Sequence, residues 1–192
     1  WIKAKESSPG SISAVWATKN TRGAIWDAMA ARETFVTSGP RIKVRFFGGP
    51  QLGTASTDPR ELVEQGYRNG VPMGGTIAKV AKAPTFTVWA SKDPDGANLD
   101  RIQIIKGMVD ADGEPQDKVI DVVWSGARRR GDDGKVPPVG NTVDVTQATY
   151  ANTIGSAELL GTWTDPEFDP EKPALYYVRV LEIPTPRWTT YD

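Results

Sequence analysis

The sequence contains no cysteine and no histidine among its 192 residues. The lack of cysteine excludes disulfides, thiolate metal sites and a cysteine nucleophile, and it is compatible with either the cytoplasm or the periplasm. The lack of histidine excludes a catalytic triad of the usual kind, an imidazole general base and a zinc site with nitrogen ligands. The chemistry that remains within the chain is that of carboxylates, or of a hard cation bound by oxygen ligands.

Long hydrophobic runs and an excess of charge of one sign are also lacking. No stretch approaches the roughly 18 apolar residues of a membrane span. The formal net charge is -1, so no basic stripe is present to neutralise nucleic-acid phosphates. Neither a nucleic acid nor a membrane span is therefore expected. What is present, 39% hydrophobic and 24% charged residues, is typical of a globular chain that buries one core.

Alternating apolar and polar residues predict that most of the chain is β-sheet. The pattern begins at Ile42, Val44 and Phe46, which alternate with Lys43 and Arg45. Further strands are predicted over residues 85–90, 101–106, 118–125, 142–147, 158–164 and 175–183. The segments DPDG, DADG, GDDG and DPEFDP between them favour tight reversals. Strands at this spacing, without βαβ alternation, predict an antiparallel sandwich.

Two short helices are expected before these strands. Residues 1–17 are predicted as a loop. A helix is predicted over residues 20–33, because its apolar residues recur at helical spacing and Thr21 can cap it; the segment TSGP then ends it. A second helix is predicted to begin at Asp58, which can cap it, with Pro59 in the first turn. The stretch RETFVTSGPRIKVRFFGG is therefore a junction from helix to strand.

Several long strings carry a resemblance to a known family. They are RETFVTSGPRIKVRFFGG, GVPMGG, APTFTVWASKDPDGANLDRIQIIKG, VPPVGNTVD and YYVRVLEIPTPRWTTYD, in that order. The chain thereby resembles, over nearly its whole length, a bacterial family catalogued as domain of unknown function 3604. Members of that family are similar to the polymerase and histidinol phosphatase (PHP) superfamily of metal-dependent phosphoesterases. The resemblance implies a distorted β/α barrel with a metal cluster, followed by a β-rich C-terminal region.

The resemblance implies that this chain is that last region, a fragment at both ends. The expected fold is mainly β with a minor helical part: an antiparallel β-sandwich preceded by a helix belonging to an absent β/α barrel. Residues 1–40, with the helix at 20–33, would be the C-terminal end of the barrel. Residues 41–192 would be a sandwich-like accessory domain, truncated at its C-terminus. The family's His-rich metal motifs have no counterpart here, so no catalytic residue and no metal ligand carries over.

A small anion site is one candidate near the mouth of that barrel. The hydroxyl groups of Thr37 and Ser38, the backbone of Gly39 and the guanidinium groups of Arg32 and Arg41 could together face a phosphate. The alternative is that Thr37 and Ser38 only satisfy the end of the helix while Arg41 is solvated.

A calcium-binding turn is a second candidate. The segment DPDGANLD offers oxygen ligands from Asp93, Asp95, Asn98 and Asp100. Its spacing is not that of an EF-hand, and the alternative is a plain reverse turn.

The seven tryptophans allow a third hypothesis, a glycan-binding surface, because sugars stack on indole rings. The alternative is that Trp89, Trp124 and Trp163, which lie in strand patterns, fill the core of the sandwich. Trp188 is the tryptophan expected to be exposed.

The functional expectation is an accessory fragment of a metal-dependent hydrolase, similar to a phosphoesterase and not catalytic alone. No cofactor is expected in this chain, and a divalent metal is expected in the full-length parent. The expected partner is the remainder of the same polypeptide, namely the upstream barrel and a further C-terminal segment. The alternative is a non-enzymatic sandwich that binds glycan or protein. The compartment stays open between the periplasm and the cytoplasm of a bacterium.

Overall fold

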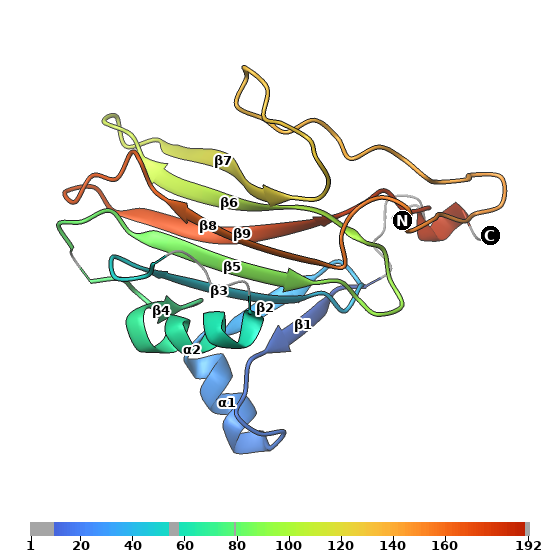
Figure 1. The fold of residues 1–192 in the computed structure, drawn as a ribbon. Coiled ribbons are helices and arrows are strands. Elements are labelled where there is room, and N and C mark those ends of the chain that lie inside the picture. Colours follow the sequence, from blue (N-terminus) through green and yellow to red (C-terminus); the bar gives the residue numbers. More distant parts are fainter. Residues whose placement is uncertain (1–9, 54–57, 79, 191–192) are drawn as a thin grey trace.

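The computed structural model describes residues 10–53, 58–78 and 80–190 (Figure 1). Over these residues the elements are β1 (Ile12–Val15), α1 (Arg22–Ala30), β2 (Thr34–Thr37), β3 (Lys43–Gly49), α2 (Pro59–Asn69), β4 (Val71–Pro72), β5 (Thr85–Ser91), β6 (Leu99–Val109), β7 (Pro115–Trp124), β8 (Glu158–Thr164), β9 (Ala174–Glu182) and a 3-10 turn (Trp188–Thr190). The fold is mainly β and its sheets are antiparallel, as predicted.

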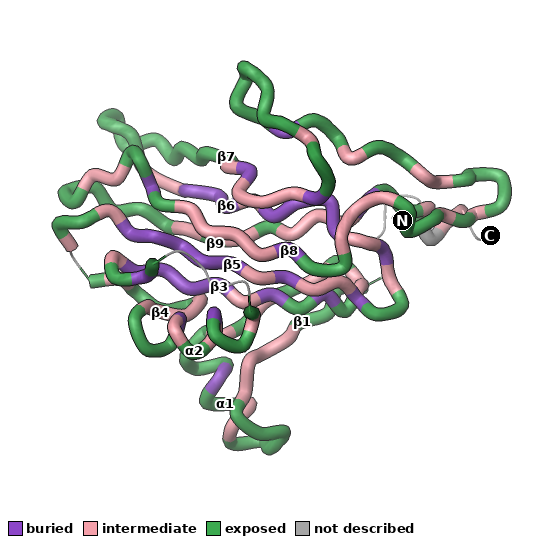
Figure 2. The backbone as a smooth tube through the Cα atoms, in the orientation of Figure 1, coloured by how far each residue is buried: buried purple, intermediate pink, exposed green. Residues whose placement is uncertain are grey.

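Two sheets face each other across one core. The first has the strand order β4-β3-β5-β8 and the second has the order β7-β6-β9. Alternate residues of both sheets point inward, and they form a single cluster of buried side chains: Ile42, Val44, Phe46, Phe86, Val88, Ala90, Leu99, Ile102, Ile104 and Leu159. In Figure 2 the buried residues accordingly run along β3, β5 and β6. Burial of these apolar side chains is the main driving force for the fold.

The two sheets approach closely where β8 lies beside β7. A Cβ atom built on Gly161 of β8 would lie 2.9 Å from the Cβ atom of Val123 and 3.2 Å from a methyl group of Val122. A glycine at this position therefore lets the backbones of the two sheets come together along one side of the core. The opposite side, between β3 and β9, stays open.

The outer face of the four-stranded sheet is covered by α2, which lies below β3 in Figure 1. The Asp58 carboxylate accepts a hydrogen bond from the backbone N–H of Arg60 at 2.8 Å, which caps the helix as predicted. Leu62 is buried with Phe47 of β3, and Gly66 faces the Phe47 ring. Packing on this ring fixes the helix against the sheet.

The N-terminal segment differs from the prediction. Residues 12–15 form β1 rather than a loop, and α1 ends at Ala30, so that Thr34–Thr37 is free to form β2 and pair with β1 in register from Ile12 opposite Thr37. The physical reason is the composition TFVT, whose β-branched and aromatic residues favour a strand over the last helical turn.

The end of α1 has an unusual residue at its cap. The N–H of Glu33 bonds to the carbonyl of Ala28, and the N–H of Arg32 bonds to the carbonyl of Met29, both at 3.0 Å. This pair of bonds is the Schellman motif, in which glycine is favoured at the left-handed position. Here Arg32 occupies that position with a φ of 60°. The backbone of the helix end is therefore strained by about 1–2 kcal/mol.

The strand predicted at residues 142–147 is wrong. Asp144 makes only an isolated bridge to Thr149, and its side chain accepts hydrogen bonds from the N–H groups of Thr146 and Gln147 at 2.9 and 3.0 Å. A carboxylate that bonds its own following backbone stabilises a turn and competes with a sheet ladder. The other predicted strands are present as β3 and β5 to β9, with small shifts of their ends.

The division predicted at residues 40 and 41 stays a prediction, although contacts cross it. The indole N–H of Trp16 donates to the carbonyl of Val44 at 2.8 Å, and the Arg45 guanidinium lies 3.5 Å above the Trp16 ring. Tyr67 of α2 donates a hydrogen bond to the Glu33 carboxylate at 2.6 Å. Among the helices described, none has the length and apolar character needed to cross a membrane.

Two helical glycines give a matched test of this packing. A Cβ atom on Gly66 would lie 2.4 Å from the buried Phe47 ring, whereas a Cβ atom on Gly23 meets nothing within 4 Å. We expect Gly66→Ala to lower the free energy of unfolding by about 1–3 kcal/mol through overpacking. We expect Gly23→Ala to leave it unchanged or raise it by up to about 1 kcal/mol through helix propensity. Urea unfolding measures both, and equal effects would contradict the packing of α2 on Phe47.

Candidate functional site

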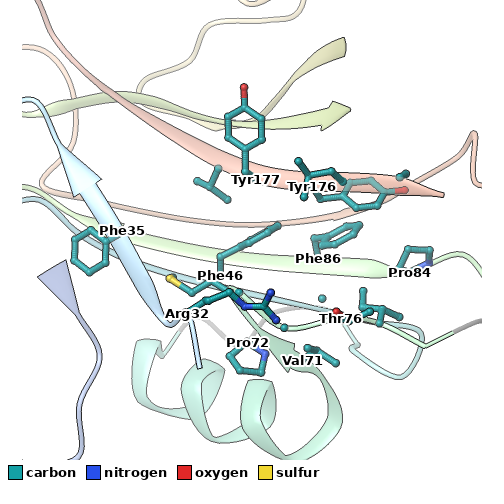
Figure 3. Close-up of a pocket in the computed structure, with 18 of the residues that line it drawn as sticks. Arg32, Phe35, Phe46, Val71, Pro72, Thr76, Pro84, Phe86, Tyr176 and Tyr177 are labelled. Atoms are coloured by element: carbon teal, nitrogen blue, oxygen red, sulfur yellow. The ribbon is translucent and has the colours of Figure 1, made fainter. Parts of the chain in front are cut away.

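A cavity of about 1040 Å³ lies between β3 and β9 (Figure 3). We call it the open-edge cavity. Its apolar lining consists of side chains from the two facing sheets and from the segments before β3 and after β4: Phe35, Ile42, Val44, Phe46, Met73, Phe86, Tyr176, Val178 and Val180. A mainly apolar lining is typical of ligand pockets, so the cavity is a candidate binding site.

The cavity is open because the two sheets differ in width. The four-stranded sheet reaches β4, whereas the facing sheet stops at β9. The outer edge of β3 is covered: the carbonyls of Val44 and Phe46 accept hydrogen bonds from the Trp16 indole at 2.8 Å and the Met73 backbone at 3.0 Å. In the part of the chain that the structure describes, no strand pairs with the outer edge of β9. The cavity therefore lies beside an unpaired strand edge.

A buried polar cluster lies behind one wall of the cavity. The Lys106 ammonium and the Tyr176 hydroxyl both donate to the same oxygen of Asp165, each at 2.6 Å. Burial alone would raise the pKa of Asp165, but the hydrogen bonds from Lys106 and Tyr176 hold it below its ordinary value. Burial and the bond to Asp165 raise the pKa of Tyr176. The cluster is therefore a carboxylate held ionised inside the protein by two donors.

The structure divides the five residues of the predicted anion site. Arg32, Thr37 and Ser38 line the open-edge cavity. The N–H of Gly39 bonds to the Thr37 hydroxyl at 3.3 Å, which satisfies the turn internally. Arg41 is drawn away to the carboxylates of the DPDG turn. The anion site stays a prediction, and the residues that the cavity could offer to it are Arg32, Thr37 and Ser38.

Arg32 differs from the other cations near the cavity. Its guanidinium group makes no hydrogen bond or ion pair with any residue that the structure describes, and in Figure 3 its side chain extends into the cavity beside Phe46 and Thr76. Lys172 lies 3.7 Å from the Asp169 carboxylate, and Arg179 donates to Gln103 at 2.9 Å. Arg32 can therefore receive an anionic group without losing an internal partner.

The predicted calcium ligands are engaged by other groups of the protein. Asp93 accepts from the Arg41 backbone N–H at 2.7 Å, and Asp95 accepts from the Arg41 guanidinium at the same distance. The backbone bond from Arg41 is the largest cause that lowers the pKa of Asp93. The backbone N–H and the guanidinium group of Arg41 thus both bind carboxylates of the DPDG turn.

The other two predicted ligands face different partners. Asn98 donates to the carbonyl of Ile154 at 2.9 Å, and Asp100 pairs with Arg101 at 3.0 Å and with Arg128 at 2.6 Å. Across the described residues no group of three or more acidic side chains is placed to hold a metal ion. The calcium site stays a prediction, and ion binding would first have to displace these arginines.

The sequence allowed the interpretation that three tryptophans of the strands fill the core, and the structure buries them only in part. Trp89, Trp124 and Trp163 are half-buried in β5, β7 and β8, whereas Trp26 on α1 is 68% exposed. The prediction for Trp188 lies outside the described side chains.

The cavity and the Asp165 cluster were not anticipated from the sequence. One signal was present: Lys106 interrupts the apolar run IQIIKGM of β6, and a lysine inside a buried strand requires an anionic partner.

Glu182, at the end of β9, is a second buried carboxylate. Its Oε1 atom is buried without a hydrogen-bond partner in the described structure. Burial, followed by repulsion from Asp93, raises the pKa of Glu182 to about 7, and Lys92 opposes this shift. Ionised Glu182 is therefore disfavoured in the folded chain.

The raised pKa of Glu182 makes stability depend on pH. Between its ordinary pKa of 4.5 and about 7 the folded state binds the proton more tightly than the unfolded state, so the free energy of unfolding falls as pH rises. We expect Glu182→Gln to remove this fall and to be more stable than the parent chain at pH 8. Urea unfolding at pH 5 and pH 8 checks this, and an unchanged slope in the variant would contradict it.

The buried ion pair between Lys106 and Asp165 gives a second prediction. Lys106→Met leaves the Asp165 carboxylate without its cation, and we expect a loss of about 3–5 kcal/mol in the free energy of unfolding. Lys118→Met removes an ion pair to Glu167 whose side chains are about half exposed, and we expect a loss below about 1 kcal/mol. Similar losses in both variants would show that Lys106 is not the cation that compensates Asp165.

The chain was compared with protein families, curated proteins and solved structures. Neither the curated proteins nor the solved structures contain a significant match to the chain. The family described as "Protein of unknown function (DUF3604)" matches residues 1–192, the whole sequence. The chain therefore belongs to the DUF3604 family.

Proposed function

We propose that this chain is a non-catalytic β-sandwich accessory domain whose role is to bind a partner in the open-edge cavity. The cavity carries the proposal: it has a volume of about 1040 Å³, and its lining combines apolar side chains of β3, β5 and β9 with residues of the segments before β3, after β4 and before β9. Exposed apolar surface is costly in water, so a hollow of this size lined by such side chains favours an occupant.

The accessory role is supported by the family and by the composition. The resemblance of the family to PHP phosphoesterases suggests a barrel in the same polypeptide with a divalent metal bound by His and Asp side chains. This chain has no histidine, so such metal ligands would come from outside it. In the parent protein the metal would supply an activated water for hydrolysis of the ester, and the sandwich would stand beside the barrel.

The second candidate is a binding module without an enzyme. Its protein-binding form is favoured by the unpaired outer edge of β9, because a strand edge offers backbone donors and acceptors to another chain. Its glycan-binding form has less support, because no tryptophan is among the described residues that line the cavity. The cavity lining thus favours a polypeptide over a sugar.

The enzyme part is tested on the longer parent polypeptide that this proposal requires, with its barrel included. We expect this polypeptide to retain divalent metal after dialysis and to hydrolyse a phosphomonoester, while the 192-residue chain does neither. Elemental analysis and a p-nitrophenyl phosphate assay measure the two properties. A longer polypeptide without metal and without hydrolysis would overturn the hydrolase assignment and leave the binding module.

The cavity part is tested with an apolar dye. We expect 1-anilino-8-naphthalenesulfonate to fluoresce on the natively folded chain, and Val178→Asp to reduce the signal several-fold because it places a carboxylate in the cavity. Val119→Asp is the control, since Val119 is 46% exposed and does not line the cavity. Cooperative thermal melts of both variants confirm folding. An equal loss in the control, or no loss in Val178→Asp, would overturn binding in the cavity.

A further inference from the structure

We propose that the occupant of the open-edge cavity is an extended polypeptide strand that pairs with the outer edge of β9. It places apolar side chains at alternate positions into the cavity and a carboxylate against Arg32. This inference rests on the proposed binding role of the cavity, and it names the class of partner and the way in which the partner binds.

The first argument is the place that the sheets leave for a strand. The four-stranded sheet ends in β4, and the facing sheet ends one strand earlier, in β9. A strand added beside β9 would lie opposite β4 and over the apolar lining formed by Ile42 and by Val44 and Phe46 of β3. An added strand would therefore complete the second sheet and cover the cavity in one step.

The second argument is the composition of β9 itself. Tyr176, Val178 and Val180 recur every second residue and pack against the core, so they define the alternation that a neighbouring strand must match. On the other face, Leu175 and Tyr177 are exposed and also line the cavity, and β9 contains no proline. Its charged residues are Arg179 and, at its end, Glu182. Such a long, apolar and unpaired edge is the kind that accepts another chain.

The remaining edges of the two sheets are protected. The edge at β8 is approached by β7, and β7 carries the charges of Asp117, Lys118 and Asp121, which discourage pairing. The edge at β4 is two residues long and contains Pro72, which has no N–H to donate. By contrast, the outer edge of β9 is nine residues long, has no proline and pairs with no strand among the described residues.

The third argument is the position of Arg32. It occupies the left-handed position of the α1 cap, with a φ of 60°, where glycine would be unstrained. The carbonyl of Arg32 lies so close to Gly74 that a Cβ atom there would be 2.2 Å from it, so the loop after β4 is built around this residue. An arginine held at this strained position, with no partner among the described residues, is suited to bind a carboxylate at the end of the cavity.

The geometry favours a strand over a small apolar molecule. A small molecule would fill the volume but would leave the N–H and C=O groups of β9 to water and would make no use of the Arg32 charge. An extended acidic and apolar peptide uses the backbone edge, the lining and the guanidinium together. Occupation by a second copy of the chain is a separate outcome of the test.

The probe is a phage-displayed library of random 12-residue peptides, selected on the folded 192-residue chain. We expect enriched peptides with apolar residues at alternate positions and at least one Asp or Glu. No enrichment, or enrichment without alternation, overturns the inference. Light scattering of the chain alone over a range of concentrations is measured in parallel, and a dimer lost in Val178→Asp would assign the edge to a second copy and likewise overturn it.

The binding mode is tested on the ligand, which avoids folding artefacts. One enriched peptide is synthesised with N-methyl groups on its odd residues and, separately, on its even residues. A strand that pairs along one edge directs alternate N–H groups to β9, so one set should weaken binding by about tenfold or more and the other should have little effect. Equal effects from both sets would contradict pairing with β9.

The carboxylate contact is tested by Arg32→Gln, which keeps a Cβ atom at the strained position. We expect a loss of affinity on the order of tenfold, because a hydrogen bond to a charged group is removed. Arg22→Gln, on the exposed first turn of α1, is the matched control and should leave affinity unchanged. Unchanged affinity in Arg32→Gln overturns the role of Arg32. Dye binding in the cavity without peptide enrichment would overturn this inference while leaving the proposed binding role intact.

Discussion

The ring of Phe86 lies between the two sheets and contacts aromatic rings from three other strands. Its centroid is 5.5 Å from Phe46 of β3, 5.9 Å from Trp163 of β8 and 4.4 Å from Tyr176 of β9. Gly48 makes room for the ring, because a Cβ atom there would lie 2.6 Å from it. The contact with Tyr176 crosses from one sheet to the other. It sets the separation of the sheets at the cavity, and the Tyr176 hydroxyl in turn reaches Asp165.

The two sides of the core are held in different ways. Where β8 lies beside β7, Gly161 lets the two sheets approach closely, and it packs against Val122 and Val123. Near Asp165 they are joined by an ion pair with Lys106, whose desolvation offsets much of its electrostatic attraction. Such a pair adds little net stability, but removing either partner would leave a buried charge. It therefore fixes how β6 lies relative to the end of β8. The bond from Tyr176 to the same carboxylate does this for β9, which gives the cavity a defined wall without filling it.

The sequence anticipated the elements whose signal is local and missed those that depend on distant partners. β5 and β8 follow from alternation, and α2 follows from Asp58 and Pro59. β1 and β2 are four residues each and are stabilised by pairing with each other, so neither gives a clear pattern alone. The cavity is assembled from segments more than 100 residues apart, and the Arg41 contact with Asp93 spans 52 residues. No pattern within a short stretch of sequence could reveal the cavity or the contact between Arg41 and Asp93.

The junction from α1 to β3 forms one wall of the cavity. Arg32, Thr37 and Ser38 belong to this junction, and β9 supplies the facing side chains. An occupant of the cavity would therefore contact two parts of the chain at once: the segment that follows α1 and the edge of the second sheet. Since Trp16 and Glu33 also tie the same segment to Val44 and Tyr67, a displacement of α1 is resisted by the first sheet. Arg32 occupies the left-handed position of the α1 cap and also lines the cavity. A strand bound in the cavity and the position of α1 would therefore depend on each other through Arg32.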